Sequence, residues 1–206
     1  MKVALVDYGA GNLRSVANAL RALGVEPVIA AAPAGLADAT HLVLPGVGSF
    51  GDCMAQLENR GFLTSIREWV AADKPYLGIC LGYQILFDSS EESPGVAGLG
   101  LLRGRVRRFE RVPGLKIPHM GWNSAVPRSP ETGNWTGLGA EPYFYFVHSY
   151  FPVPENPQII AAHTTYGADT FAAAIERPRL LACQFHPEKS QDAGLRLIRN
   201  FLECGV

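Results

Sequence analysis

The sequence predicts an α/β protein with a mostly parallel central sheet, helices on its faces and an antiparallel extension. Two observations lead to this prediction. In the first half of the chain, short apolar strand patterns alternate with helical patterns, which is typical of a parallel sheet covered by helices. After about Arg103, strand patterns follow one another without helices between them, which favours antiparallel pairing.

The first half supplies the elements of the parallel part. Residues 3–7 form a short apolar run, and apolar residues then recur at helical spacing from Leu13 to Leu23. Asn12 is the expected N-cap of this helix and Gly24 its end. The same patterns predict further strands at 26–31, 41–45 and 76–80, helices at 51–60 and 62–72, and a short helical segment at 83–87.

The second half supplies the antiparallel extension and the last helix. Arg103, Arg105 and Arg107 alternate with smaller or apolar residues, and together with Arg108 they are most simply a solvated strand face; a phosphate or an acidic partner is the less favoured interpretation. Segments 143–147 and 159–163 also look like strands. Residues 127–142 are rich in Pro, Gly, Ser and Thr and predict a loop. The chain closes with a strand at 180–185 and an amphipathic helix at 192–202, capped near Ser190, and we expect one domain over 1–206.

Composition excludes several classes of protein. The 206 residues are 48% hydrophobic with a net charge of −1, so the chain can bury a core without disulfide support. The balanced charge disfavours binding to nucleic acid or to an anionic membrane. No apolar run approaches the roughly 20 residues of a membrane span, and Asp7 interrupts any signal peptide. We therefore expect a soluble, cytoplasmic protein.

The four cysteines indicate neither a zinc site nor a disulfide framework. Cys53, Cys80, Cys183 and Cys204 are widely and irregularly separated, with no C-x-x-C pair. Each is by default a small buried apolar residue. Only a cysteine in a special backbone setting deserves a chemical role.

Cys80 has such a setting. Residues 78–82 (GICLG) follow a predicted strand and precede a helical pattern, which is the cysteine form of the G-x-S-x-G nucleophile turn. Gly78 and Gly82 would permit a sharp turn, and a sulfur at the start of a helix is favoured as thiolate. Alternatively, the glycines only ease packing and Cys80 is inert. The pentapeptide alone leaves both interpretations open.

A candidate base follows the strand at 180–185. Pro187 disfavours helix at His186, so we expect His186 and Glu188 in extended geometry with side chains on the same side. Glu188 could then accept from one imidazole nitrogen while the other faces the sulfur of Cys80. A lone histidine at a strand end is usually an ordinary hydrogen-bonded residue, but this pair beside a cysteine turn predicts a triad.

These residues resemble the two signatures of the class I glutamine amidotransferases, at 78–84 (GICLGYQ) and 186–188 (HPE). Four further motifs are similar to those of the glutaminase subunits of imidazole glycerol phosphate synthases: 7–13 (DYGAGNL), 45–48 (PGVG), 118–123 (PHMGWN) and 145–150 (YFVHSY). The resemblance spans nearly the whole chain and implies the flavodoxin-like architecture of that class.

The resemblance implies hydrolysis of glutamine to glutamate and ammonia. The ammonia would pass to a cyclase subunit, in a heterodimer that makes imidazole glycerol phosphate and an aminoimidazole carboxamide ribonucleotide in histidine biosynthesis. Cys80 would attack the amide carbon, His186 would protonate the departing ammonia and then activate water, and Glu188 would hold the imidazole. We expect no metal and no organic cofactor.

The oxyanion formed in this reaction needs backbone donors. We expect one at Leu81, at the start of the helix after the nucleophile, and the other in the turn Gly46, Val47 and Gly48, although that turn could be a plain strand-to-helix connection. The resemblance adds Gln84 and the Ser149–Tyr150 backbone as contacts for the amino-acid end of glutamine.

The resemblance also assigns a partner-facing side. It places Asn12, Met120, Trp122, Tyr145 and Lys189 toward the cyclase, although Met120 and Trp122 could equally be packed inside. Gly9-Ala10-Gly11 resembles the opening of a dinucleotide fingerprint, but Arg14 occupies the third glycine position, so we expect only a tight turn.

Two alternatives remain beside the glutaminase. One keeps the triad but assigns another amide or γ-glutamyl substrate without ammonia transfer. The other is a flavodoxin-like binding or scaffold protein with an inert Cys80. Covalent labelling of Cys80 by a glutamine-like electrophile and release of ammonia separate these hypotheses.

Overall fold

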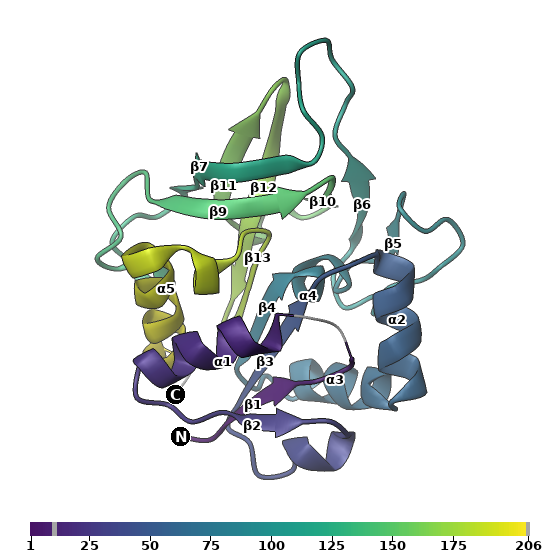
Figure 1. Ribbon diagram of the computed structural model, residues 1–206, viewed down its shortest axis with the longest axis vertical. Coiled ribbons are helices and arrows are strands. Elements are labelled where there is room, and N and C mark those ends of the chain that lie inside the picture. Colours follow the sequence, from purple (N-terminus) through teal and green to yellow (C-terminus); the bar gives the residue numbers. More distant parts are fainter. Residues whose placement is uncertain (10–11, 205–206) are drawn as a thin grey trace.

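An eight-stranded mixed sheet forms the centre of the computed structural model, which describes residues 1–9 and 12–204 (Figure 1). In spatial order its strands are β2 (Val28–Ala30), β1 (Val3–Val6), β3 (His41–Gly46), β4 (Tyr76–Cys80), β13 (Leu180–Cys183), β12 (Asp169–Arg177), β11 (Ile160–Tyr166) and β8 (Val126–Pro127). The first five are parallel and the last three continue the sheet in antiparallel pairs. A mostly parallel sheet with an antiparallel extension is therefore confirmed.

Helices cover both faces of the parallel part. The helices α1 (Leu13–Ala22) and α5 (Gln191–Cys204) pack on one face, and α2 (Phe50–Asn59) and α3 (Phe62–Ala71) on the other (Figure 1). The buried strand β1 shows the reason, because Val3 and Leu5 join the first core while Ala4 and Val6 join the second. The chain thus folds as two apolar cores on either side of one sheet.

Two small sheets lie outside the central one. The first contains β10 (Tyr150–Pro154), β6 (Gly104–Arg108) and β5 (Ser89–Ser90), and the second is the antiparallel ribbon of β7 (His119–Ser124) and β9 (Tyr143–His148). The strands expected at Arg103 to Arg107 and at 143–147 therefore exist, but neither extends the central sheet. That extension is built by β11, which confirms the strand expected at 159–163, and by β12 and β8, which were not predicted. The pattern of β12 was missed because it carries a run of alanines without alternation.

The arginine strand is only partly a solvated face. Arg107 forms an ion pair with the buried carboxylate of Asp169 and lies over the ring of Phe151 at 4.8 Å. Arg103 lies 3.6 Å from Asp88 at the surface. The carboxylate of Asp169 therefore satisfies Arg107 within the chain.

The segment 127–142 is a loop with a buried anchor. It contains one turn of 3-10 helix at Gly133–Trp135, and the Trp135 side chain is fully buried. Asn200 on α5 donates its amide to the carbonyls of Asn134 and Thr136 at 2.9 and 2.8 Å. The loop is thus fixed to the last helix.

The two predicted helix caps use their side chains elsewhere. Asn12 stands at the N-cap position of α1 but makes no side-chain capping bond. The Ser190 hydroxyl, next to the start of α5, donates to the carbonyl of His186 at 2.6 Å and accepts from Tyr145 N–H at 3.0 Å. Ala10 and Gly11, part of the predicted glycine turn, lie outside the described residues. Within 1–9 and 12–204, no helix is long and apolar enough to cross a membrane.

Candidate active site

Cys80 ends the buried strand β4 at its carboxyl edge and immediately precedes the single-turn helix α4 (Leu81–Gln84). Its φ of 55° and ψ of −105° are a strained combination for a residue with a side chain. The flanking glycines are required by close packing, since a Cβ on Gly82 would lie 1.9 Å from the carbonyl of Leu44 and one on Gly78 2.5 Å from the carbonyl of Gly82. The turn therefore has the geometry expected of a nucleophile elbow.

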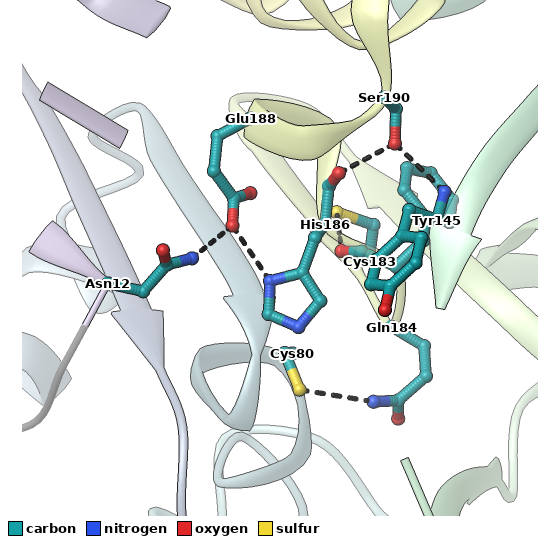
Figure 2. A network of polar contacts seen from close by, with 9 residues as sticks. Asn12, Cys80, Tyr145, Cys183, Gln184, His186, Glu188 and Ser190 are labelled. Atoms are coloured by element: carbon teal, nitrogen blue, oxygen red, sulfur yellow. Dashed lines mark hydrogen bonds and ion pairs between the residues drawn. The ribbon is translucent and has the colours of Figure 1, made fainter. Parts of the chain in front are cut away.

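The charge that faces the Cys80 sulfur comes from a side chain rather than from the helix. Four residues make α4 too short to carry a large terminal dipole. The imidazole of His186 points at Cys80 (Figure 2), and its Nε2 has no hydrogen-bond partner among the described residues. This nitrogen is available for proton exchange at the sulfur.

His186 and Glu188 meet as predicted, but by a different local route. His186 is extended, with φ −104° and ψ 92°, whereas Glu188 lies in a turn of 3-10 helix at Pro187–Lys189. Pro187 takes the first position of this turn, where its missing N–H is not needed. Nδ1 of His186 lies 2.8 Å from Oε1 of Glu188, and both side chains are buried. The expectation of extended geometry at Glu188 was wrong, because the proline starts a turn instead.

Burial opposes protonation of His186, but the charges of Cys80 and Glu188 outweigh it and raise the pKa of the imidazole to about 10. At neutral pH the ring is therefore an imidazolium, with the carboxylate of Glu188 on one side and the sulfur of Cys80 on the other (Figure 2). Such an arrangement can supply a proton to a leaving group.

A second donor holds the carboxylate of Glu188. The amide Nδ2 of Asn12 also donates to Oε1, the oxygen nearest His186 (Figure 2). This contact explains why Asn12 does not cap its own helix. It gives Asn12 a place in the site, which the sequence motif alone did not reveal.

A cavity of about 240 Å³ opens at Cys80. Most of the predicted binding residues line it, together with three that were not predicted; the lining residues are Val47, Gly48, Cys80, Leu81, Gln84, Glu92, Val147, His148, Ser149, Tyr150 and His186. Gly46 is not in the lining. It pairs with Cys80 across β3 and β4, and a Cβ there would lie 2.5 Å from Cβ of Leu81, so it lets the two strand ends approach. The predicted nucleophile, base, oxyanion turn and substrate contacts therefore meet at one cavity.

The turn after β3 is open at Gly48. This residue has a φ of 102°, which suits glycine, and a Cβ would meet no atom within 4 Å. The left-handed backbone, rather than steric crowding, therefore favours glycine at position 48. The turn lines the cavity beside Leu81.

Gln184 is the clearest residue that sequence reasoning missed. It is fully buried on the segment between β13 and His186, and its Nε2 lies 3.6 Å from the sulfur of Cys80 (Figure 2). Its Oε1 accepts from Gln84 at 3.0 Å. A glutamine two residues before the predicted base, in an otherwise apolar strand pattern, was the available signal.

Four of the five residues expected to face a partner lie together on the β7–β9 ribbon and the turn Pro187–Lys189. Met120 is 62% exposed and Trp122 47% exposed, so neither is packed inside. The ring of Trp122 meets that of Tyr145 edge-on at 6.3 Å, and Nζ of Lys189 lies 5.9 Å from the Tyr145 ring. Exposed Tyr143 continues this face. Asn12 differs from the other four, because its amide points inward to Glu188.

The chain matches the family of class-I glutamine amidotransferases over residues 4–204. It is 48% identical to "Imidazole glycerol phosphate synthase subunit HisH" of Synechococcus elongatus over 201 residues, which covers 98% of this chain and 92% of the relative. The protein of the same name from Gloeobacter violaceus is 49% identical, with 98% of this chain and 88% of the relative covered.

Solved structures show the same fold at lower identity. A crystal structure of a glutamine amidotransferase superimposes with a TM-score of 0.75 at 23% identity, covering 98% of both chains. The structure of PurLQS from Thermotoga maritima gives a TM-score of 0.73 at 21% identity, covering 98% of this chain and 97% of that chain.

Proposed function

The chain belongs to the class-I glutamine amidotransferase family, and we propose that it is the glutaminase subunit of an imidazole glycerol phosphate synthase. In this role it hydrolyses glutamine to glutamate and ammonia and passes the ammonia to a cyclase subunit, which makes imidazole glycerol phosphate and an aminoimidazole carboxamide ribonucleotide in histidine biosynthesis. The observation that carries the proposal is that Cys80 and His186, more than a hundred residues apart, line one cavity, while the buried carboxylate of Glu188 holds His186 from behind.

In the first half of the reaction, the sulfur of Cys80 attacks the amide carbon of glutamine. The carbonyl π bond opens to a tetrahedral oxyanion, and the proton on Nε2 of His186 moves to the amide nitrogen. The C–N bond then breaks, ammonia leaves, and a thioester remains on Cys80. The orientation of Nε2 toward the sulfur, with no competing partner among the described residues, supports this role.

In the second half, His186 must act as a base. The negative charge at Cys80 helps to raise the pKa of His186, and that charge disappears when the thioester forms. The imidazole can then stay neutral and take a proton from water, which attacks the thioester carbon and releases glutamate. Glu188 keeps the other proton on Nδ1 throughout, because it accepts from that nitrogen.

The oxyanion would be bound by backbone N–H groups at Leu81 and in the Gly46–Val47–Gly48 turn. Leu81, Val47 and Gly48 line the cavity beside Cys80, which supports this assignment. One such donor typically contributes about 3 to 4 kcal/mol to stabilising the transition state. The left-handed backbone of Gly48 allows the turn to present its amides without a side chain in the way.

The amino-acid end of glutamine would lie between Glu92 and the Ser149–Tyr150 backbone. The carboxylate of Glu92 lines the cavity and has the charge to bind an α-ammonium group. Both amide hydrogens of Gln84 are already donated, to Tyr150 O and Gln184 Oε1, each at 3.0 Å. Gln84 can therefore offer the substrate only its carbonyl oxygen.

We propose the exposed face of the β7–β9 ribbon as the docking site for the cyclase in a heterodimer. Met120, Trp122 and Tyr145 are of the residue types enriched in interface cores, and Lys189 adds a cation beside the ring of Tyr145. The face is continuous with the cavity through Val147, which pairs with Met120. We also propose one domain over residues 1–206 and a cytoplasmic location. The family match over 4–204 supports the first, and the need of Cys80 for a reduced thiol supports the second.

The test is glutamate production by the chain alone and by the chain with the cyclase and its nucleotide ligand. We expect slow hydrolysis of glutamine by the chain alone and a strong increase in the complete complex. Equal rates would remove the synthase assignment and leave a plain glutaminase. Hydrolysis of another amide or γ-glutamyl compound in preference to glutamine would favour a different hydrolase of the same family.

A further inference from the structure

Side-chain hydrogen bonds connect the ribbon strand β7 with the sulfur of Cys80 through the backbone carbonyl of Tyr150. The outer end of this series is fixed at Asn123. The N–H of Ser124 donates to Oδ1 of Asn123 at 2.9 Å, and Nδ2 donates to the carbonyl of Thr165 at 3.0 Å, which settles the orientation of the amide. Nδ2 also lies 3.3 Å from Nε2 of His119. Because an amide nitrogen can only donate, Nε2 of His119 accepts and the proton of this ring is on Nδ1.

The hydrogen bond of His148 independently shows which ring nitrogen of the histidine pair carries the proton. Nδ1 of His148 lies 2.8 Å from the carbonyl of Tyr150, which can only accept, so His148 also carries its proton on Nδ1. Its Nε2 is then an acceptor for Nδ1–H of His119, at 3.1 Å. Both imidazoles therefore have one defined tautomer, and the donors all point from β7 toward Tyr150.

The second half of the series approaches Tyr150 from the nucleophile. Gln84 donates from Nε2 to the Tyr150 carbonyl and to Oε1 of Gln184, each at 3.0 Å. Nε2 of Gln184 in turn lies 3.6 Å from the sulfur of Cys80 (Figure 2). The carbonyl of Tyr150 is thus the meeting point of two sets of donors, one from the histidine pair and one from the glutamine pair.

The members of the series are shielded from water. His119, His148, Gln84 and Gln184 are each at most 6% exposed. Burial lowers the pKa of His119 to about 4, and burial together with the neighbouring His119 and His186 lowers that of His148 to about 3. Both rings are therefore neutral at physiological pH, as the donor order requires.

We propose that this series, named here the His119–Cys80 chain, positions the Cys80 sulfur and the Tyr150 carbonyl for reaction with glutamine. It makes Gln184 and His119 positioning residues, and it rests on the proposed glutaminase function. A donor aimed at the sulfur holds the thiolate in one direction. The Tyr150 carbonyl accepts two hydrogen bonds, which fix the wall of the cavity beside the sulfur. The series begins on the strand whose alternate residues, Met120 and Trp122, face outward.

Gln184→Met tests the inner end, because methionine keeps the volume and removes both hydrogen bonds. Loss of a hydrogen bond to a charged group typically changes a rate or equilibrium constant by at least about tenfold. We expect alkylation of Cys80 by iodoacetamide at pH 7, followed on the Cys80 peptide, to slow about tenfold, and kcat for glutamine to fall by a similar factor with less change in KM. Asn200→Leu is the matched control, since it removes two hydrogen bonds of a buried side chain, to the carbonyls of Asn134 and Thr136, and neither bond belongs to the His119–Cys80 chain.

His119→Phe tests the outer end. Phenylalanine keeps the stacking of His119 between Phe146 and Tyr166, with ring centroids at 4.8 and 4.0 Å. It leaves Nε2 of His148 without its donor. We expect kcat to fall about threefold or more and Cys80 alkylation to change in parallel, although the substituted side chain does not touch the cavity.

Nitrogen-15 NMR of the unsubstituted protein provides a test that needs no variant. Protonated Nδ1 and bare Nε2 on both His119 and His148 support the chain, and a proton on Nε2 of either ring overturns it. Wild-type rates of both reactions in folded Gln184→Met and His119→Phe also overturn it. If the unsubstituted protein fails to hydrolyse glutamine, the proposed function is wrong. Alkylation and NMR still test the His119–Cys80 chain in that case.

Discussion

The side-chain amide of Asn12 donates to Oε1 of Glu188, the oxygen that also accepts from His186 (Figure 2). These residues are 176 positions apart in the sequence. Two donors on one oxygen fix the plane of a buried carboxylate, and the carboxylate in turn fixes the ring of His186. The start of α1 therefore contributes to the proposed catalytic site as well as to the scaffold.

Replacing Asn12 tests this relationship. We expect Asn12→Ala to lower kcat for glutamine about tenfold with little change in KM, because Glu188 loses one of the donors that orient it. Asn12→Asp should reduce kcat further, since it places a second negative charge beside Glu188. Steady-state kinetics of both variants, with the exposed Asn18→Ala on the same helix as control, provide the measurement. Unchanged kcat in Asn12→Ala would show that His186 alone orients the carboxylate.

The ionisation of His186 should depend on the sulfur. The pKa of His186 is raised to about 10, and Cys80 contributes to that rise against the effect of burial. Removing the sulfur in Cys80→Ala should therefore lower the pKa of His186, and Glu188→Gln should lower it too. Carbon-13 NMR of the imidazole as a function of pH measures both effects. The same titration midpoint in all three proteins would exclude coupling between the base and the nucleophile.

The buried histidine pair should make the fold sensitive to acid. The pKa values of His119 and His148 are depressed to about 4 and about 3, below the ordinary value of 6.5, so the unfolded chain binds more protons below pH 6.5. The contribution of the two histidines to the free energy of unfolding is full above that pH and decreases as the pH falls toward 4. Each histidine contributes a slope of about 1.4 kcal/mol per pH unit in this window.

Urea unfolding between pH 7 and pH 4.5 measures this slope. In His119→Phe one of the two titrating groups is gone, and His148 loses the positive charge of its neighbour. We expect a shallower decline in the free energy of unfolding than in the unsubstituted protein. Parallel curves for the two proteins would show that the pair does not control acid stability.

Gly82 should tolerate no side chain. A Cβ there would lie 1.9 Å from the carbonyl of Leu44, which is backbone in the middle of the sheet and cannot move away. We expect Gly82→Ala to lower the free energy of unfolding by about 3 kcal/mol or more, the upper range for overpacking. Gly95→Ala is the control, because its φ of 85° is strained but nothing lies within 4 Å, and it should lose only about 1 kcal/mol. Equal losses in thermal or urea unfolding would mean that the elbow relaxes around the methyl group.

Local patterns in the sequence were sufficient for the parallel half of the fold. The strands β1, β3 and β4 and the helices α1, α2 and α3 lie within a few residues of the predicted ranges, because strong apolar periodicity marks each of them. The partners of β6 and of β9 could not be predicted in this way: β6 pairs with β10 and β5, and β9 pairs with β7. Which strand lies beside which depends on contacts far apart in the chain, and the alternation of arginines in β6 is compatible with more than one sheet.

The residues of the site likewise divide into those with a local sequence signal and those without one. Cys80 and His186 were found because a glycine turn and a proline give each a recognisable local backbone. Gln184 and the inward amide of Asn12 have no such signature. Their roles appear only when Cys80 lies beside one and Glu188 beside the other, across 104 and 176 positions of sequence.

Covalent labelling tests the catalytic assignment most directly. A diazo-ketone analogue of glutamine loses nitrogen when a thiolate displaces it, and peptide mass spectrometry locates the resulting thioether. We expect one adduct per chain, on Cys80, blocked by excess glutamine and absent in Cys80→Ser. A glutamine-protected adduct on any other residue, or full glutaminase activity in Cys80→Ser, would contradict the assignment of Cys80 as the nucleophile.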